Sequence, residues 1–240
     1  MSRADIQRRG LCLLISMAAS LVSGAAVLAQ PIPSHPRELA FDDLSFEPPS
    51  ADEHRFELSN GVVVYVVPDH SLPLVTVSVL VHTGSYLDPP GTPGVAALTG
   101  SQMRAGGTVD LLPSELDEEA AFLATEISSA IGDTSGRATL NCLSKDLDES
   151  LSLLFEMLRN PRFDQARLDL AKSQLLQQME RRNDSSQSIE IREWRRLLRG
   201  ENHFTTMPMT QSGLESIDRE DLLAFHREFY HPGNFVFAVS

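Results

Sequence analysis

Cysteine is scarce in this sequence, which has two such residues among its 240. Cys12 lies in an apolar N-terminal segment, and Cys142 stands alone in the rest of the chain. A single cysteine excludes an intrachain disulfide and a cysteine-rich metal site there. We therefore expect Cys142 to pack as a small apolar side chain.

Basic residues are also in deficit. Lysine and arginine total 20 against 33 aspartates and glutamates, which gives a net charge of −13. A chain this acidic repels nucleic acid and anionic membranes and favours solubility. We therefore expect no nucleic-acid partner, and no membrane partner once the N-terminal segment is removed.

Only one long hydrophobic run is present, from Leu11 to Ala29, and it follows Arg3, Arg8 and Arg9. A positive start, an apolar stretch and small residues before residue 30 are typical of a cleaved signal peptide. We predict that residues 1–29 are this signal and that the protein is exported, to the periplasm or the extracellular space. A retained membrane anchor is the alternative, because the run is close to spanning length. Residues 30–54 are predicted to be a linker.

Strand and helix patterns alternate over residues 55–240. Two hairpins are predicted, one around Asn60-Gly61 and one around 132–136, together with a half-buried strand over 75–81 and a late strand over 235–239. Apolar residues at helical spacing predict helices over 95–104, 114–125, 147–158, 168–179, 189–198 and 221–230. The fold class is therefore α+β: an antiparallel-rich sheet from two hairpins and a late strand, packed on several helices.

Four short segments, in this order and spacing, resemble one half of an insulinase/pitrilysin-type metallopeptidase. They are Leu-Ser-Asn-Gly-Val (58–62), Gly-Ser-Tyr-Leu-Asp-Pro-Pro-Gly (84–91), Leu-Arg-Asn-Pro-Arg-Phe (158–163) and Ile-Asp-Arg-Glu-Asp-Leu (217–222) running to Tyr-His-Pro-Gly-Asn (230–234). The resemblance covers roughly residues 55–240. It implies that this region is an insulinase-like N-terminal domain, truncated because family members continue beyond the last strand with a further helix. Phe235, Phe237 and Val239 would then lie on an exposed face.

Active members of this family carry His-x-x-Glu-His on the helix after the Pro/Gly loop. The two histidines, one helical turn apart, bind the same zinc ion. The glutamate takes a proton from the zinc-bound water. A later helix supplies a glutamate as the third ligand.

This sequence departs from that pattern at every one of these positions. Gly94-Val95-Ala96 aligns the helix and places Ala97 at the first histidine, Gly100 at the glutamate and Ser101 at the second histidine. Gln178 falls at the third ligand. Serine and glutamine are poor zinc ligands. We therefore predict no catalytic residue, no metal site and no cofactor, although active members use zinc.

No shift of the alignment restores the motif, because no histidine occurs between His82 and His203. His226 and His231 are five residues apart and point away from each other on a helix, so we interpret them as a polar helix end. His70 and His82 could approach across a hairpin, but no third ligand is evident. Ser101 as a nucleophile would need a histidine base, and nothing in the sequence suggests one.

Two further features follow the degenerate helix. Arg104 precedes a glycine pair that is expected to end the helix with a residue at positive φ, and we assign the arginine a structural role. Ser114 is predicted to open the next helix with a capping box, and the acidic residues after it are expected to face solvent: Glu115, Asp117, Glu118 and Glu119.

Four functions remain open from the sequence. The first is an exported pseudopeptidase subunit that supports a partner chain of the same family with an intact zinc motif, by supplying part of a chamber wall and a strand edge for an extended peptide. The second is a stand-alone periplasmic peptide-binding protein. The third is a fragment of a longer two-domain family member. An active peptidase is the fourth, and the missing ligands argue strongly against it.

Overall fold

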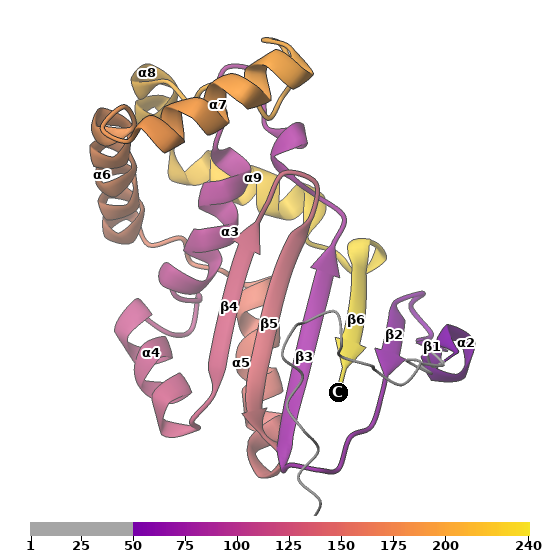
Figure 1. The fold of residues 1–240 in the computed structure, drawn as a ribbon. Helices are drawn as coiled ribbons and strands as arrows, with labels where there is room; N and C mark the ends of the chain where they lie inside the picture. The colour runs from indigo at the N-terminus through magenta and orange to yellow at the C-terminus, as the bar shows by residue number, and fades with distance from the viewer. Residues whose placement is uncertain (1–49) are drawn as a thin grey trace, which may run out of the picture. The chain divides into compact units, whose positions relative to one another are not determined.

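The computed structural model describes residues 50–240, and Figure 1 shows how their strands and helices are arranged. The predicted signal peptide and residues 30–49 of the predicted linker lie outside the described residues. The end of that linker forms a one-turn helix, α2 (Ala51–His54). Its His54 side chain is tied to the sheet, because Nδ1 lies 3.1 Å from the carbonyl oxygen of Val66.

Within this part of the chain, six strands form a sheet in the order β1-β2-β6-β3-β5-β4. Both predicted hairpins are present, and the late strand lies between them, parallel to β2 and antiparallel to β3. The predicted α+β fold with an antiparallel-rich sheet is therefore confirmed. The strands are β1 (Arg55–Glu57), β2 (Val63–Val66), β3 (Leu74–Val81), β4 (Glu126–Ile131), β5 (Gly136–Leu143) and β6 (Phe235–Val239).

The predicted helices are also found, within a few residues of their expected ends. They are α3 (Val95–Ala105), α4 (Pro113–Phe122), α5 (Leu147–Arg159), α6 (Gln165–Arg181), α7 (Ser186–Arg199) and α9 (Arg219–Phe229). The sequence analysis missed α8 (Gln211–Ser216), because a helix of six residues is too short to show a period. Among the described helices, none is both long and apolar enough to cross a membrane.

The core lies on one face of the sheet. Val77, Val79 and Val81 of β3 are buried on that face, while Thr76 and Ser78 point to the other side. Helices α5 and α9 run behind the sheet in Figure 1, and residues of α3, α5 and α9 join the same apolar cluster. Cys142 of β5 belongs to this cluster, as expected, and burial raises the pKa of its thiol.

The start of α4 differs from the prediction. The N-cap residue is Leu112 rather than Ser114, because Pro113 has no N–H to satisfy and suits the first helical position. The predicted box from Ser114 to Asp117 is therefore replaced by one in which the Glu115 carboxylate accepts the Leu112 N–H at 2.7 Å. The helix ends at Phe122 because Ala124 adopts a positive φ of 48° and the Thr125 N–H bonds back to Ala120.

His226 corrects another prediction. Its side chain is buried, not part of a polar helix end. The ring stacks on Tyr230, and its Nε2 lies 2.8 Å from the carbonyl oxygen of Leu158, which accepts a hydrogen bond from it. Burial lowers the pKa of His226 below its usual value of 6.5, although the bond to Leu158 opposes this shift.

The buried histidine makes stability depend on pH. Because the unfolded chain binds a proton on His226 more readily than the folded chain, the free energy of unfolding should fall as pH drops below about 6.5. The decline should level off once pH passes below the lowered folded-state pKa. His226→Gln keeps a donor for Leu158 but cannot titrate, so chemical unfolding from pH 7.5 to 5 should show a smaller decline.

His231→Gln, a change at an exposed histidine of the same region, is the matched control for this experiment. Equal slopes for the wild type and His226→Gln would contradict the assignment.

Candidate functional site

The candidate site is the exposed side of α3, the helix on which the family pattern expects zinc ligands. Ala97 and Ser101 are both exposed and lie one turn apart, as the spacing predicts. The Ser101 hydroxyl donates to the carbonyl oxygen of Leu98 at 3.1 Å. Gln178 lies on a different helix, α6, with its side chain exposed.

Asp88 fixes the start of α3. Its carboxylate accepts the backbone N–H groups of Gly94 and Ala96, each at 2.7 Å, and so caps a helix whose N-cap residue is glycine. Burial raises the pKa of Asp88, and these two hydrogen bonds partly offset that effect. The Pro/Gly loop therefore sets the position of the helix start through this carboxylate.

Gly100 is buried where α3 meets β4. A Cβ atom at this position would overlap the backbone nitrogen of Ile131 and would lie 2.8 Å from the carbonyl carbon of Ala130. Both of these are backbone atoms, which cannot swing aside as a side chain can. The position at which the family pattern expects a catalytic glutamate thus has no room for any side chain.

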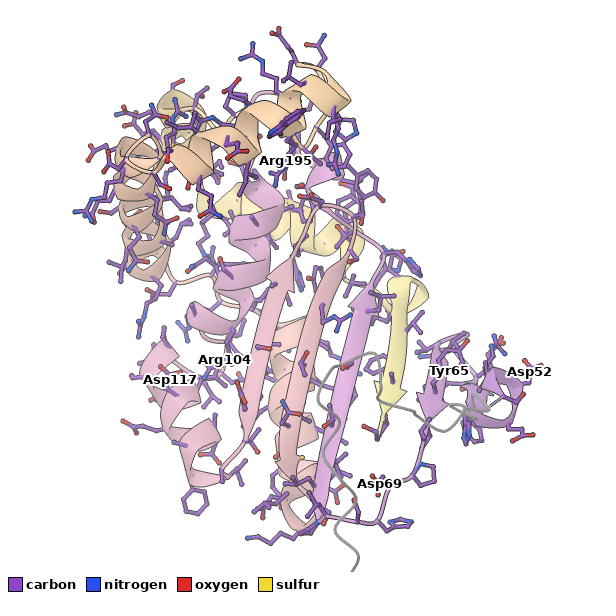
Figure 2. The ribbon with its side chains drawn as sticks, in the orientation of Figure 1. Asp52, Tyr65, Asp69, Arg104, Asp117 and Arg195 are labelled. Carbon is purple, nitrogen blue, oxygen red and sulfur yellow. The ribbon has the colours of Figure 1, made fainter. Side chains whose placement is uncertain are left out.

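Arg104 joins three elements at the other end of α3. Its Nε donates to the carbonyl oxygen of Ile127 in β4 at 3.2 Å, and its Nη1 lies 2.7 Å from the Asp117 carboxylate of α4. Figure 2 shows Arg104 and Asp117 between these helices. This supports the structural role predicted for Arg104, and it shows that Asp117 is engaged rather than simply facing solvent. The glycine pair behaves as predicted, since Gly107 has a φ of 70°.

A hollow of about 470 Å³ opens beside Ala97, between the Pro/Gly loop, the turn after β4 and the segment before α8. Gln178 is not part of its wall. Tyr86 and Phe204 meet edge to face with their ring centroids 6.1 Å apart, and Phe204 stacks on His203. No sequence pattern predicted this wall, because residues 200–210 show no periodicity. The side chains that line it are mostly apolar, among them Tyr86, Ala97, Phe204, Met207 and Met209.

The structure does not bring the remaining histidine pair, His70 and His82, together. His70 lies in the loop before β3 and His82 directly follows β3, so the two are at opposite ends of that strand. Among residues 50–240, no group of three or more histidine, cysteine, aspartate or glutamate side chains is placed to hold a metal ion.

Comparison with known proteins identifies the class. The family model described as insulinase (peptidase family M16) matches residues 63–201, more than half of the chain. The chain therefore belongs to the insulinase family. No curated protein matches the sequence.

Solved structures agree with this fold. The inactive domain of an M16 peptidase from Pseudomonas fluorescens superposes with a TM-score of 0.72 at 23% identity, over 77% of this chain and 45% of that one. A protease from Helicobacter pylori gives 0.64 at 19% identity, over 77% and 45%. The periplasmic protease PqqL from Escherichia coli gives 0.68 at 17% identity, over 79% and 22%. The chain thus spans less than half the length of these proteins.

The contact at Gly100 predicts how an attempt to rebuild the family motif should fail. Ala97→His with Ser101→His changes two exposed positions, and the free energy of unfolding should stay within about 0.5 kcal/mol of the wild type. Adding Gly100→Glu should lower the free energy of unfolding by roughly a further 1–3 kcal/mol or more, because the new side chain overpacks the contact between α3 and β4. Urea unfolding of the double and triple variants measures the difference.

Zinc titration of the same two proteins supplies the second measurement. A triple variant that is as stable as the double variant and binds one zinc tightly would contradict this account of α3.

Proposed function

We propose that this chain is an exported, non-catalytic member of the insulinase family that supports a zinc-bearing partner chain of the same family. The proposal rests on the residues that α3 carries at positions 97, 100 and 101. Positions 97 and 101 hold alanine and serine, and position 100 abuts the backbone of β4. A helix of this kind can position its neighbours but has no group to bind zinc or to act as a general base.

Two relatives support parts of this proposal. The Pseudomonas fluorescens structure is described as an inactive domain, and PqqL as a periplasmic protease. Export of the present chain rests on its N-terminal segment, with three arginines ahead of an apolar run. A partner that supplies the zinc site would use what this half still offers, which is its shape and its sheet.

A stand-alone peptide-binding role is the second candidate, and the hollow beside Ala97 favours it. Tyr86, Phe204 and Met207 give it an apolar wall suited to a hydrophobic side chain. Addition of a peptide strand at β4 is less favoured, because Arg104 already bonds the carbonyl oxygen of Ile127. Binding of peptides by the purified chain alone, lost in Phe204→Ala, would favour this candidate over the paired subunit.

Metal content tests the non-catalytic part of the proposal. Elemental analysis of the purified, untagged protein should find well under one zinc per chain, since tight zinc binding depends on strong ligands. The protein should not cleave unfolded peptides. Cleavage that a chelator abolishes, in a preparation free of host proteases, would sink this part.

Co-expression tests the partner. A family member with intact His-x-x-Glu-His, encoded beside this chain, should co-purify with it and show higher peptidase activity than either chain alone. The matched control is the same partner with its glutamate replaced by glutamine, which should still bind this chain but remain inactive. If the intact partner purifies alone and is fully active, the subunit role is wrong.

A further inference from the structure

Helix α7 presents its side chains to solvent, including the apolar ones. None of its 14 residues is buried. Figure 1 shows it at the top of the view, with the last residue of β6, marked C, well below it. A helix of a globular domain ordinarily turns large apolar side chains to the core, as α5 does with Leu153 and Leu154. Four such side chains of α7 are instead exposed to between 52% and 78%: Ile191, Trp194, Leu197 and Leu198.

These four side chains lie on one side of the helix. Trp194 is followed by Leu197 and Leu198 at i+3 and i+4, and Ile191 precedes it by three residues, so they form a stripe along one face. The stripe is about 10 Å long. This arrangement is set by the sequence of α7 itself, which gives the helix an apolar side and a polar side.

The polar side of α7 is basic, although the chain as a whole is acidic. Four arginines against two glutamates give the helix a net charge of +2, whereas the whole chain carries −13. The expectation that the protein repels anionic membranes follows from the total charge. Because charges act over about 10 Å at ordinary salt concentrations, a partner at α7 meets the local positive charge first.

Two arginines border the apolar stripe. Arg195, labelled in Figure 2, lies one turn from both Ile191 and Leu198, and Arg199 follows it by one further turn. Together with the stripe they line a shallow hollow of about 460 Å³. Arg199 donates from Nη1 to the Thr205 hydroxyl at 2.8 Å, a contact that leaves its charge uncompensated.

The other two arginines of α7 are engaged with carboxylates. Arg192 pairs with Glu193 at 3.7 Å, and Arg196 pairs with Glu201. Within residues 50–240, no such ion pair involves Arg195 or Arg199. The arginines beside the stripe therefore keep their positive charges available, and a guanidinium binds phosphate oxygens through two parallel hydrogen bonds.

The two sides of α7 together match one kind of surface. A helix with tryptophan and leucine on one face and arginine on the other is typical of helices that lie in the interface of an anionic bilayer. The indole ring suits the headgroup level, where one edge is apolar and the other is wet. An apolar stripe alone would suit a protein partner equally well, and the arginines beside it favour a surface of phosphates.

From these observations we propose that α7 binds the surface of a bilayer that contains anionic phospholipids. The stripe enters the boundary between headgroups and acyl chains, and Arg195 and Arg199 bind lipid phosphates. The helix lies in the plane of the surface, since its 14 residues span only about 21 Å. This inference does not rest on the proposed function, because it involves neither α3 nor the hollow beside Ala97.

Trp194 reports on the proposed contact, because it is the one tryptophan in the sequence. The purified protein is titrated with vesicles of phosphatidylglycerol and phosphatidylcholine at 1:1, and with vesicles of phosphatidylcholine alone. The emission of Trp194 should move to shorter wavelength, with an apparent affinity at least about tenfold higher for the anionic vesicles. Added salt should reduce this difference. The apolar run over residues 11–29 would also bind lipid, so the readout is tryptophan emission and not sedimentation with vesicles.

Substitutions at exposed positions separate the apolar and charged contributions. Arg195→Glu should weaken binding to the anionic vesicles at least about tenfold, and Leu198→Glu should do the same. Arg137→Glu on β5 and Leu170→Glu on α6 are the matched controls, also at exposed positions, and should bind like the wild type.

Glu190 supplies a variant that should gain affinity. It precedes Trp194 by one turn and so lies on the side of the helix that faces the bilayer. Glu190→Gln removes a negative charge there and should strengthen binding about fivefold. Circular dichroism and thermal unfolding establish that each variant is folded.

Three outcomes would overturn the proposal. One is an emission of Trp194 that anionic vesicles leave unchanged. Another is an equal effect of Arg195→Glu and Arg137→Glu, which would mean that total charge alone decides binding. The third is a shift of Trp194 emission when the protein is concentrated without lipid, which would assign the stripe to a contact between copies of the chain.

Discussion

The pairing of β6 with β2 and β3 is the contact on which the rest of the sheet depends. Strand β6 comes from the end of the described chain and lies between two strands from its beginning, with Val64 and Val79 both opposite Phe237. Without β6, the β1–β2 hairpin would be a separate two-stranded unit, and such a unit is at best marginally stable. The contact spans nearly the whole domain in sequence, so closing it costs more chain entropy than a local hairpin and is expected to slow folding.

The same strand also borders an apolar groove among the described residues. Its odd-numbered residues face the helical side, but α5 covers only the neighbouring strands, so the side chains over β6 and β2 line a groove rather than a closed core. Phe235, Phe237 and Val239 are half-buried there, and not fully exposed as predicted from the sequence. A half-buried phenylalanine gains only part of the free energy of burial, and the remainder would be gained if its exposed area were removed from water.

The sequence predicted those parts of the structure that repeat a local pattern. The alternation of valine and polar residues over β3, and the asparagine-glycine turn before β2, depend on the backbone period and on turn geometry alone. The sequence failed where a side chain from elsewhere decides the outcome. His226 is buried because Phe163 and Tyr230 pack against it and Leu158 offers a carbonyl, and no pattern within α9 shows this.

The candidate site likewise has one part that the sequence predicted and another that it did not. Helical periodicity correctly predicted that Ala97 and Ser101 lie one turn apart on α3. The cap from Asp88 and the apolar wall that includes Phe204 come from loops without periodicity, so the sequence did not predict them. Gly100 touches the backbone of β4 because α3 and β4 lie close together. The spacing of residues along one helix carries no information about the distance to a strand.

The contact at Gly100 explains why α3 packs closely on the sheet. A helix that carries a side chain at position 100 must stand away from the strand by the size of that side chain. Glycine lets the two backbones touch, which adds dispersion contacts along the helix and offsets the low helix propensity of glycine, about 1 kcal/mol against alanine. Because a strand backbone fills this space, a single substitution cannot place a carboxylate at position 100 unless the helix and the strand first separate. The absence of a side chain at position 100 and the close packing of α3 on β4 therefore depend on each other.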